Sequence, residues 1–382
     1  MASPPWENQT VIVEFVLLGF STIWQLNIAL FTTFLASYIF TVTGNGLIVL
    51  LVVLDHHLHI PMYFFLVNLS FLEIGYTSNI IPRMLASILA GRKTISVASC
   101  LTQFYFFGSL AATECLLLAA MSYDRYVAIC QPLRYTVLMN GQVCVGLAAS
   151  SWVCCFLLTA LTIILLSRLT FCGPNEIDHF FCDFTPLVQL SCTDTSLMET
   201  IAFATSSAVT LVPFLLITAS YSCILTTILR IPSGAGRRKA FSTCSSHFTV
   251  VTMFYGTLIA TYLAPSAHSS QFLRKVFSLL YTILTPMFNP IIYSLRNRDI
   301  HEALKRYLSR KMVLFQRLNR YVCDGFPKPQ GIYTFRIKHC RILEGIILDV
   351  ISYNFSSLCM CVCVYSKIFV TVKVIQTLFK DF

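Results

Sequence analysis

Apolar residues occur in long runs along this chain, and short polar segments separate them. A helix needs about 20 consecutive apolar residues to cross the hydrocarbon core of a bilayer. The runs predict seven spanning helices, at 26–54, 61–89, 100–122, 143–166, 200–229, 239–263 and 276–295. The pattern therefore predicts an all-α membrane protein that forms a seven-transmembrane helix bundle.

Composition excludes a water-soluble core and gives the bundle an orientation. Of the 382 residues, 56% are hydrophobic and 12% are charged, against about 25% charged in soluble domains. Twelve Lys and Arg residues lie on the segments predicted to be inside: Arg125, Arg134, Arg230, Arg237, Arg238, Lys239, Arg296, Arg298, Lys305, Arg306, Arg310 and Lys311. Six lie on those predicted to be outside: Arg83, Arg92, Lys93, Arg168, Arg274 and Lys275. This asymmetry predicts an extracellular N-terminus and a cytoplasmic C-terminus. We therefore attribute the net charge of +10 to membrane orientation and contact with anionic lipid, and not to nucleic-acid binding.

The chain divides into four predicted regions. Residues 1–25 form an extracellular tail with an N-glycosylation sequon at Asn8, and 26–295 form the seven-transmembrane domain. Residues 296–311 are basic and amphipathic, which predicts a helix on the inner membrane surface. Residues 312–382 form a C-terminal extension.

An acid and a base stand side by side near the predicted end of the third helix. Ionisable groups at membrane depth are costly and usually functional. Asp124 can hold Arg125 by a charge-assisted hydrogen bond in one state and release it in another. The alternative is that the pair only anchors the helix at a fixed depth.

Two carboxylates, Glu73 and Glu114, lie at similar depth on neighbouring predicted helices. Such a pair would share a proton or a monovalent cation such as Na⁺, rather than stay doubly ionised. Two neutral, hydrogen-bonded carboxylic acids are an equally weighted alternative.

Two helices carry polar or helix-breaking residues within their apolar runs. Asn45, between Gly44 and Gly46, is predicted to face the bundle interior, or else the two glycines make a helix-packing notch. Pro290 cannot donate a backbone hydrogen bond and should kink the seventh helix, so that Asn289 caps the freed carbonyl or reaches another helix.

Four cysteines fall on the predicted outer side of the membrane: Cys100, Cys172, Cys182 and Cys192. An even number of cysteines in an oxidising compartment predicts two disulfides. The sequence alone leaves three pairings open.

Five strings, in this order, resemble the olfactory receptor family of rhodopsin-like, G-protein-coupled receptors. They lie at 58–66, 121–135, 220–221, 239–247 and 286–293, and the resemblance covers about residues 8–311. The long loop with His179-Phe180-Phe181-Cys182-Asp183 is similar to the tetrapod-type, class II branch.

The resemblance implies a switch. Arg125, in the triplet Asp124-Arg125-Tyr126, would hold the inactive state through Asp124, and would meet Tyr221 and the G protein once the sixth helix swings outward. Asn289, Pro290 and Tyr293 would form a second switch on the seventh helix. The disulfides implied by the resemblance are Cys100–Cys182 and Cys172–Cys192.

The resemblance also implies an odorant receptor of the plasma membrane that activates the olfactory stimulatory G protein and raises cyclic AMP. Its pocket would be lined by Phe107, Gly108, Ala111, Ala112, Thr205, Ser206, Val209, Tyr255, Leu258, Ile259, Tyr262, Leu279 and Thr282. These residues are apolar or hydroxylated and carry no charge, which suits small, hydrophobic, volatile ligands. An enzyme is not expected, since the chain lacks a His-Glu-x-x-His motif, a phosphate loop and a nucleophile elbow.

Two features depart from the family pattern. Glu73 stands where most members carry Asp, which moves the carboxylate one methylene further from the backbone. Residues 312–382 continue beyond the position where family members usually stop. The alternative function is therefore a non-signalling or poorly trafficked receptor variant, impaired by its extension.

Overall fold

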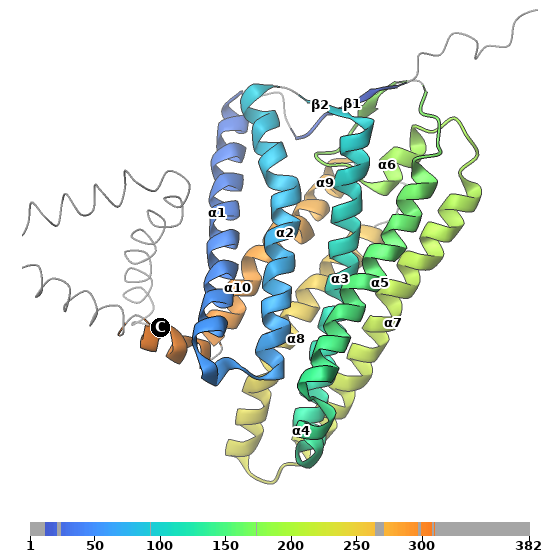
Figure 1. Cartoon of the computed structure of the whole chain (residues 1–382). Helices are drawn as coiled ribbons and strands as arrows, with labels where there is room; N and C mark the ends of the chain where they lie inside the picture. The colour runs from blue at the N-terminus through green and yellow to red at the C-terminus, as the bar shows by residue number, and fades with distance from the viewer. Residues whose placement is uncertain are drawn as a thin grey trace, which may run out of the picture. The chain divides into compact units, whose positions relative to one another are not determined.

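Long helices run side by side to form a bundle (Figure 1). The computed structural model describes residues 12–20, 24–91, 93–172, 174–263, 271–296, 299–307 and 309. Within these ranges the long helices are α1 (Trp24–Leu54), α2 (Pro61–Ala90), α3 (Val97–Cys130), α5 (Gly141–Leu166), α7 (Ser196–Leu229), α8 (Gly234–Leu263), and a seventh made of α9 (Gln271–Leu279), a π-helical turn (Leu280–Leu284) and α10 (Thr285–Arg296). Shorter pieces are α4 (Tyr135–Leu138), α6 (Phe184–Gln189) and the 3₁₀ turns His56–Leu58 and Pro132–Arg134. The seven-helix bundle predicted from the sequence is confirmed.

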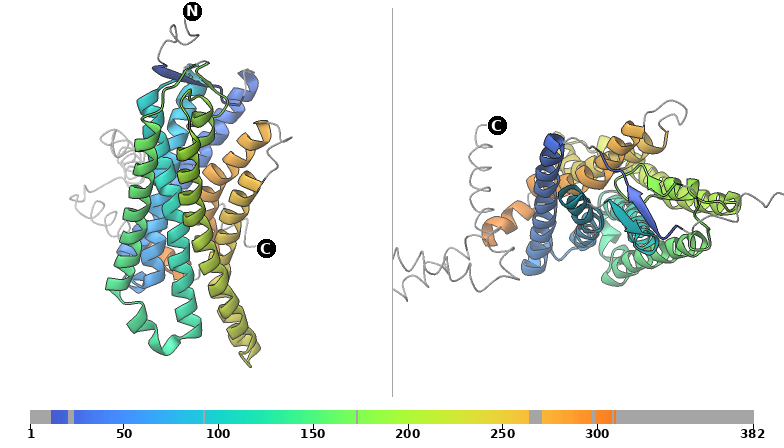
Figure 2. Two further views of the ribbon diagram at one scale, coloured as in Figure 1. Left: turned by 90° about the vertical axis from the view of Figure 1, so that its right-hand side faces the viewer. Right: turned by 90° about the horizontal axis from the view of Figure 1, so that it is seen from above.

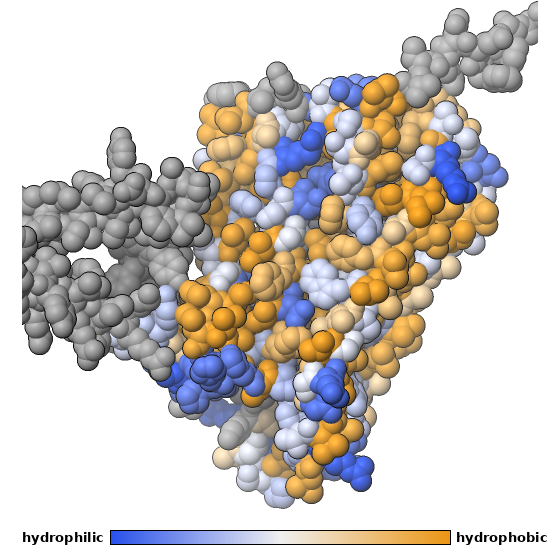
Figure 3. All heavy atoms as spheres, viewed as in Figure 1, coloured by the Kyte–Doolittle hydropathy of each residue, from blue (hydrophilic) through white to orange (hydrophobic). Residues whose placement is uncertain are grey.

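Six of the seven long helices among the described residues are long and apolar enough to cross a membrane. The seventh, α8, has basic residues near its start. The lateral surface suits lipid. Figure 3 shows broad hydrophobic areas along the flank of the bundle, and exposed side chains such as Leu157 and Leu161 on α5 and Leu215 on α7 contribute to this surface. Soluble proteins rarely expose so much contiguous apolar surface.

Helix α3 lies at the centre of the bundle and packs against α2, α5, α7 and α8. It begins at Val97 because the Ser96 side chain accepts a hydrogen bond from the backbone N–H of Ser99. It ends at Cys130, two residues before Pro132, and the residue before a proline disfavours helical geometry. The prediction that this helix ends near Ser122 was therefore wrong, and the Asp124-Arg125-Tyr126 triplet lies inside it.

A three-stranded sheet in the order β2-β1-β3 lies across one end of the bundle (Figure 2), called the sheet end below. Strand β1 (Glu14–Leu17) pairs antiparallel with β2 (Thr94–Ser96) and parallel with β3 (Glu176–Ile177). Phe15 and Leu17 are buried, whereas Glu14 is exposed, as expected for a strand with one face on a core. The region predicted to be a tail thus supplies the central strand of this cap. The sequon at Asn8 lies outside the described residues.

Helices α1 and α10 approach each other closely around Pro290. The proline cannot donate to the carbonyl of Pro286, one turn earlier, and the Asn45 amide lies 3.5 Å from that oxygen while donating to Thr41 O at 3.1 Å. A Cβ built on Gly44 would lie only 2.9 Å from Cβ of Pro290. The inward-facing Asn45 and a packing notch are therefore both present, and the notch is made by Gly44, not Gly46.

Gly44→Ala should destabilise the bundle by about 1–3 kcal/mol, the usual cost of overpacking a rigid core, because Pro290 cannot rotate its ring away. Gly46→Ala is the matched control. Nothing lies within 4 Å of its built Cβ, and alanine is favoured over glycine in a helix by up to about 1 kcal/mol. Thermal unfolding of the purified proteins should show a lower midpoint for the first variant only, and equal midpoints would contradict the close approach.

The chain divides into two units, Met1–Leu304 and Lys305–Phe382, and the described bundle and sheet belong to the first. Residues 299–307 are helical, as predicted for part of 296–311, and Tyr63 of α2 donates to Asp299 at 2.8 Å. Residues 312–382 lie outside the described residues.

Candidate functional site: a buried switch and a pocket under a folded cap

The switch proposed from the sequence is centred on the Asp124–Arg125 pair in α3. Both residues are buried, and the Arg125 guanidinium donates to Asp124 Oδ2 from Nε at 3.0 Å and from Nη2 at 2.5 Å. The Tyr135 hydroxyl donates to Asp124 Oδ1 at 2.8 Å. Burial, followed by the field of Asp124, raises the pKa of Tyr135, so the phenol keeps its proton and remains a donor. Both carboxylate oxygens are thereby occupied, and the arginine is held next to its own acid.

Tyr221 of α7 forms a contact that the sequence analysis did not anticipate. Its hydroxyl lies 2.7 Å from Nδ1 of His247 on α8, and the two rings are nearly parallel, with their centroids 5.8 Å apart. His247 is fully buried. The contact joins α7 to α8 in the state in which Arg125 is bound to Asp124. The available signal for it was the string at 239–247, which ends on His247.

Tyr126 does not take part in the acid–base pair. It is half-buried, its hydroxyl accepts a hydrogen bond from Gln131 at 3.2 Å, and its ring stacks on Tyr123 with a centroid distance of 6.3 Å.

The predicted switch on the seventh helix connects to the predicted acid pair. The Asn289 amide donates to the Glu73 carboxylate of α2. Glu73 and Glu114 are both buried, and Glu73 lies close enough to exert an electrostatic influence on Glu114. One oxygen of each carboxylate, with Asn289 Oδ1 and the Tyr293 hydroxyl, has no hydrogen-bond partner among the described residues. Asn289 thus reaches another helix, which was one of the two alternatives.

The residues predicted to line an odorant pocket fall into groups. Phe107, Tyr255 and Thr282 are buried, whereas Ser206 and Ile259 are exposed. Gly108 faces α5, since its built Cβ would lie 3.2 Å from Thr159 Cγ2. The half-buried members are Ala111, Ala112, Thr205, Val209, Leu258 and Leu279. The side chain of Tyr262 lies outside the described residues.

Phe107 is the centre of an aromatic cluster. Its ring centroid lies 4.8 Å from that of Phe181, 5.2 Å from Tyr76 and 6.1 Å from Tyr281. Tyr255 of α8 and Phe214 of α7 form another aromatic pair, with their ring centroids 5.1 Å apart. Phe181 was not among the predicted pocket residues. Its position next to Cys182 was the available signal, because a bridge to Cys100 would hold it against α3.

Two disulfides hold the long loop between α5 and α7 in place at the sheet end. Cys100 of α3 is joined to Cys182, and Cys172 is joined to Cys192, with Cα–Cα distances of 5.5 and 6.0 Å. Asp178 also forms an ion pair with Lys275 of α9, which donates to Gly19 O at 2.7 Å. The loop is therefore attached to α3, to α9 and to the segment that follows β1.

The comparisons with known proteins agree with this geometry. A family model described as olfactory receptor matches residues 34–311. Human olfactory receptor 11A1 is 52% identical over 304 residues, which is 80% of this chain and 96% of the relative. Mouse olfactory receptor 1M1 is 46% identical over 306 residues, which is 80% of this chain and 98% of the relative. The chain belongs to the olfactory receptor family.

The fold is also that of squid rhodopsin, which matches 77% of the receptor and 88% of its own chain with a TM-score of 0.56 at 15% identity. The receptor is thus an odorant receptor of the G-protein-coupled class and not an enzyme. Its ligand is a small molecule, its protein partner is a G protein, and it is a multi-pass membrane protein. The family match ends at residue 311, so the extension 312–382 lies beyond it.

The loop gives the receptor a pH-dependent contact. His179 is buried, with Nε2 3.3 Å from Ser278 Oγ, and burial followed by the charge of Lys275 lowers its pKa to about 4. An unfolded histidine titrates near 6.5. Between these values only the unfolded chain takes up the proton. The stabilisation of the folded receptor by the neutral, buried His179 is therefore complete above about pH 6.5 and is lost as the pH falls toward 4.

Acidification should therefore lower the melting temperature of the receptor, and His179→Gln should reduce that fall. Each pKa unit corresponds to about 1.4 kcal/mol, so the loss reaches roughly 3 kcal/mol by pH 4. Melting would be followed at about pH 7.5 and about pH 5 for both proteins. An identical fall in both would show that other groups carry the pH dependence.

Proposed function

We propose that this receptor binds a small, hydrophobic, volatile odorant in the half of the bundle nearest the sheet, and that binding activates the olfactory stimulatory G protein and raises cyclic AMP. The observation that carries the proposal is the joint presence of aromatic clusters at Phe107 and at Tyr255 and a closed ion pair at Asp124 and Arg125.

The region around Phe107 suits such a ligand. Aromatic rings supply apolar contact area. The Tyr255 hydroxyl has no hydrogen-bond partner among the described residues and is available to an alcohol, aldehyde or ketone. The Thr282 hydroxyl already donates to Ser278 O at 2.7 Å and can only accept a hydrogen bond from a ligand such as an alcohol. None of the thirteen predicted lining residues is charged. An amine ligand would require an acidic partner that this set does not contain.

Activation is a shift between two states. In the closed state Arg125 is bound to Asp124, and Tyr221 to His247. An odorant that binds better when α8 has moved away from α7 shifts the population toward the open state. The Tyr221–His247 contact then separates, and Arg125 leaves Asp124 to meet Tyr221 and the G protein. The ligand and the G protein therefore bias the same equilibrium from opposite ends of α3.

We infer that the sheet end is extracellular and that the end carrying α4 is cytoplasmic. The support is the excess of Lys and Arg on the segments at the α4 end, together with two disulfides at the sheet end, which require an oxidising compartment. The basic residues at the cytoplasmic end would contact anionic lipid.

We further propose that Glu73 and Glu114 hold a sodium ion between them. The site fits this ion because its unpartnered atoms are oxygens: one from each carboxylate, and Oδ1 of Asn289. Hard cations prefer oxygen ligands, and a cation would satisfy buried acceptors that the described residues leave open. The ion would link α2, α3 and α10 in the closed state.

Sodium should raise the melting temperature of the purified receptor above that in choline chloride of equal ionic strength. Glu114→Gln should remove the difference, because it keeps the shape of the side chain and removes a charge. Equal melting temperatures of the unmodified receptor in both salts would contradict the proposal and leave the pair as carboxylic acids that share protons.

Cyclic AMP in cells, screened against a broad panel of volatile organic compounds, tests the proposed function. The full chain is compared with a version ended after Lys311, where the family match also ends, and surface expression is measured for both. A response from both establishes an odorant receptor that tolerates its extension, and a response from the short form alone supports the alternative of an impaired variant. Silence from both, with both at the cell surface, would leave the fold standing and the function open.

A further inference from the structure

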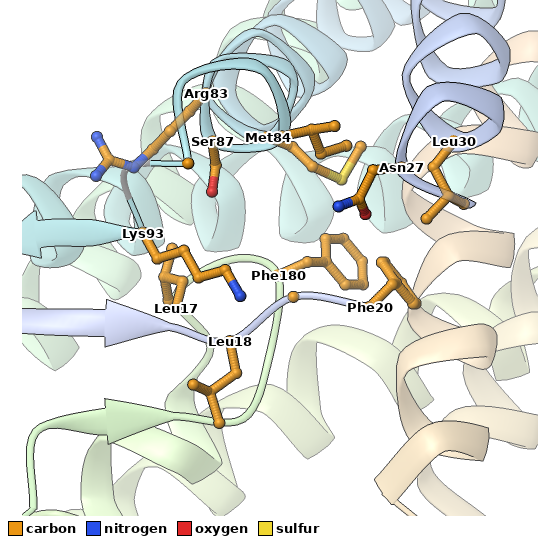
Figure 4. A pocket seen from close by; sticks show the side chains of 13 residues that line it. Leu17, Leu18, Phe20, Asn27, Leu30, Arg83, Met84, Ser87, Lys93 and Phe180 are labelled. Carbon is orange, nitrogen blue, oxygen red and sulfur yellow. The ribbon is translucent and has the colours of Figure 1, made fainter. Parts of the chain in front are cut away.

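A cavity lies at the sheet end, between α1, α2, β1 and the long loop. Its volume is about 270 Å³, and none of the thirteen residues predicted to contact an odorant lines it. Figure 4 shows side chains from α1, α2 and the loop converging on it. The cavity is therefore separate from the region around Phe107.

Most of its wall is apolar. Leu30 of α1, Met84 and Ile88 of α2, and the rings of Phe20 and Phe180 face the space. The two rings stack on each other, with their centroids 5.0 Å apart. Such a wall would bind the hydrocarbon part of a ligand.

The charged part of the wall is entirely positive. Arg83 and Lys93 line the cavity, and no residue of its lining is acidic. The Arg83 guanidinium already donates to Thr94 O at 2.7 Å. The Lys93 ammonium forms no ion pair or hydrogen bond with any described side chain, and it points into the cavity in Figure 4, on the side toward Phe180. The Asn27 amide faces the same space. A cation and an amide donor beside an apolar wall select an anionic head on a hydrophobic tail.

We infer that this cavity is a second ligand site of the receptor, and that its ligand is a small amphiphile with a single carboxylate. Lys93 and Asn27 bind the carboxylate, and Leu30, Met84 and Ile88 contact the chain. A cavity of this volume is sufficient for a chain of about eight carbons.

The cavity also adjoins the predicted odorant region. Phe180, in its wall, lies 4.9 Å from Phe181, and Phe181 lies 4.8 Å from Phe107. A ligand seated against Phe180 thus contacts a packed aromatic chain that ends at the odorant region. Any effect of the carboxylate on odorant response rests on the proposed function, whereas its binding does not.

Photo-crosslinking tests the binding without any signalling readout. The probe is octanoate with a diazirine on its terminal carbon, applied to the full chain in phosphatidylcholine nanodiscs, and labelled peptides are identified by mass spectrometry. Labels should fall on α1 and α2 at residues such as Leu30, Met84 and Ile88. Unlabelled octanoate should compete about tenfold better than octanol, which corresponds to about 1.4 kcal/mol for the charged head.

Variants make the test specific. Lys93→Met keeps the aliphatic stem and removes the charge, so labelling should fall about tenfold, equivalent to about 1.4 kcal/mol. Ile88→Trp should fill the cavity and abolish labelling. Arg168→Met, at an exposed arginine of the same end that does not line the cavity, is the matched control and should change nothing. Melting temperatures verify that each variant is folded. Labels outside the cavity, or labelling by folded Lys93→Met equal to that of the unmodified receptor, would overturn the inference.

Discussion

The Arg125→Ala receptor should reach the cell surface at the level of the unmodified receptor and yet give almost no cyclic AMP response to an agonist. Arg125 is the cation of the buried pair in α3, and both of its bonds to Asp124 come from the guanidinium. The proposed open state needs that guanidinium at a new partner. Alanine removes every donor, so the open state loses its contact with the G protein.

The magnitude follows from coupling energies. Allosteric coupling between two sites is typically about 1–3 kcal/mol, so losing the contact on the G-protein side should reduce the response roughly tenfold or more. Folding should suffer less. The Tyr135 hydroxyl still donates to Asp124 at 2.8 Å and continues to hold the carboxylate.

Arg134→Ala is the control for the loss of a positive charge at the same end of the bundle, because Arg134 is exposed and its removal should leave the response intact. Surface labelling and cyclic AMP are measured in the same cells. An Arg125→Ala receptor that reaches the surface and signals normally would refute the role assigned to Arg125, and the anchor interpretation of the pair would then be preferred.

The sequence was sufficient for the bundle because spanning helices depend on local information. An apolar run of suitable length must form a helix in lipid, since nothing else satisfies its backbone. The inward direction of Asn45 followed from the same reasoning, because its amide had to find a partner inside the bundle. The adjacency of Asp124 and Arg125 likewise required no tertiary knowledge.

Features that depend on distant partners could not be predicted in the same way. Strand β1 has four residues, and its partners begin at Thr94 and Glu176, so no local pattern identifies the sheet. The π-helical turn Leu280–Leu284 has no sequence signal comparable to a proline. The end of α3 was misplaced because the charges of Asp124 and Arg125 were taken to mark the membrane boundary, whereas mutual pairing allows them to remain inside the helix.

The candidate site likewise combines features that local sequence predicts with features that only the fold reveals. Residue chemistry indicated Glu73, Glu114 and Asn289 individually, but only the fold shows that Asn289 donates to Glu73. Similarly, His247 became a candidate switch residue only when α8 placed it 2.7 Å from Tyr221. The cavity beside Lys93 is lined in part by Leu17 of β1 and by the residues that follow it, and it could not be derived from a sequence in which β1 was not recognised.

Cys100→Ser should keep the receptor inside the cell and abolish surface staining. The Cys100–Cys182 bridge closes a loop with a sequence separation of 82 residues. In the chain-entropy account, closing a loop of that size stabilises the folded state by about 4.5 kcal/mol. That is comparable to the whole free energy of unfolding of many domains, roughly 5–15 kcal/mol.

The loss should extend beyond one contact, because the bridge positions several others. Cys182 is buried, and its backbone N–H donates to Gln103 of α3 at 3.0 Å. Phe181, which packs on Phe107, precedes it directly. Without the bridge this part of the loop can leave α3, and the polar atoms and aromatic rings beneath it become exposed, which is the kind of surface that quality control retains.

Two comparisons make the measurement decisive. Cys223→Ser removes an exposed free thiol and should leave surface staining unchanged, so any loss is due to the bridge and not to cysteine removal. Cys172→Ser opens a loop with a separation of 20 residues, worth about 3.3 kcal/mol in the same account, and should give an intermediate surface level. Normal staining of Cys100→Ser would mean that the sheet and the ion pair of Lys275 with Asp178 hold the long loop in place without the bridge.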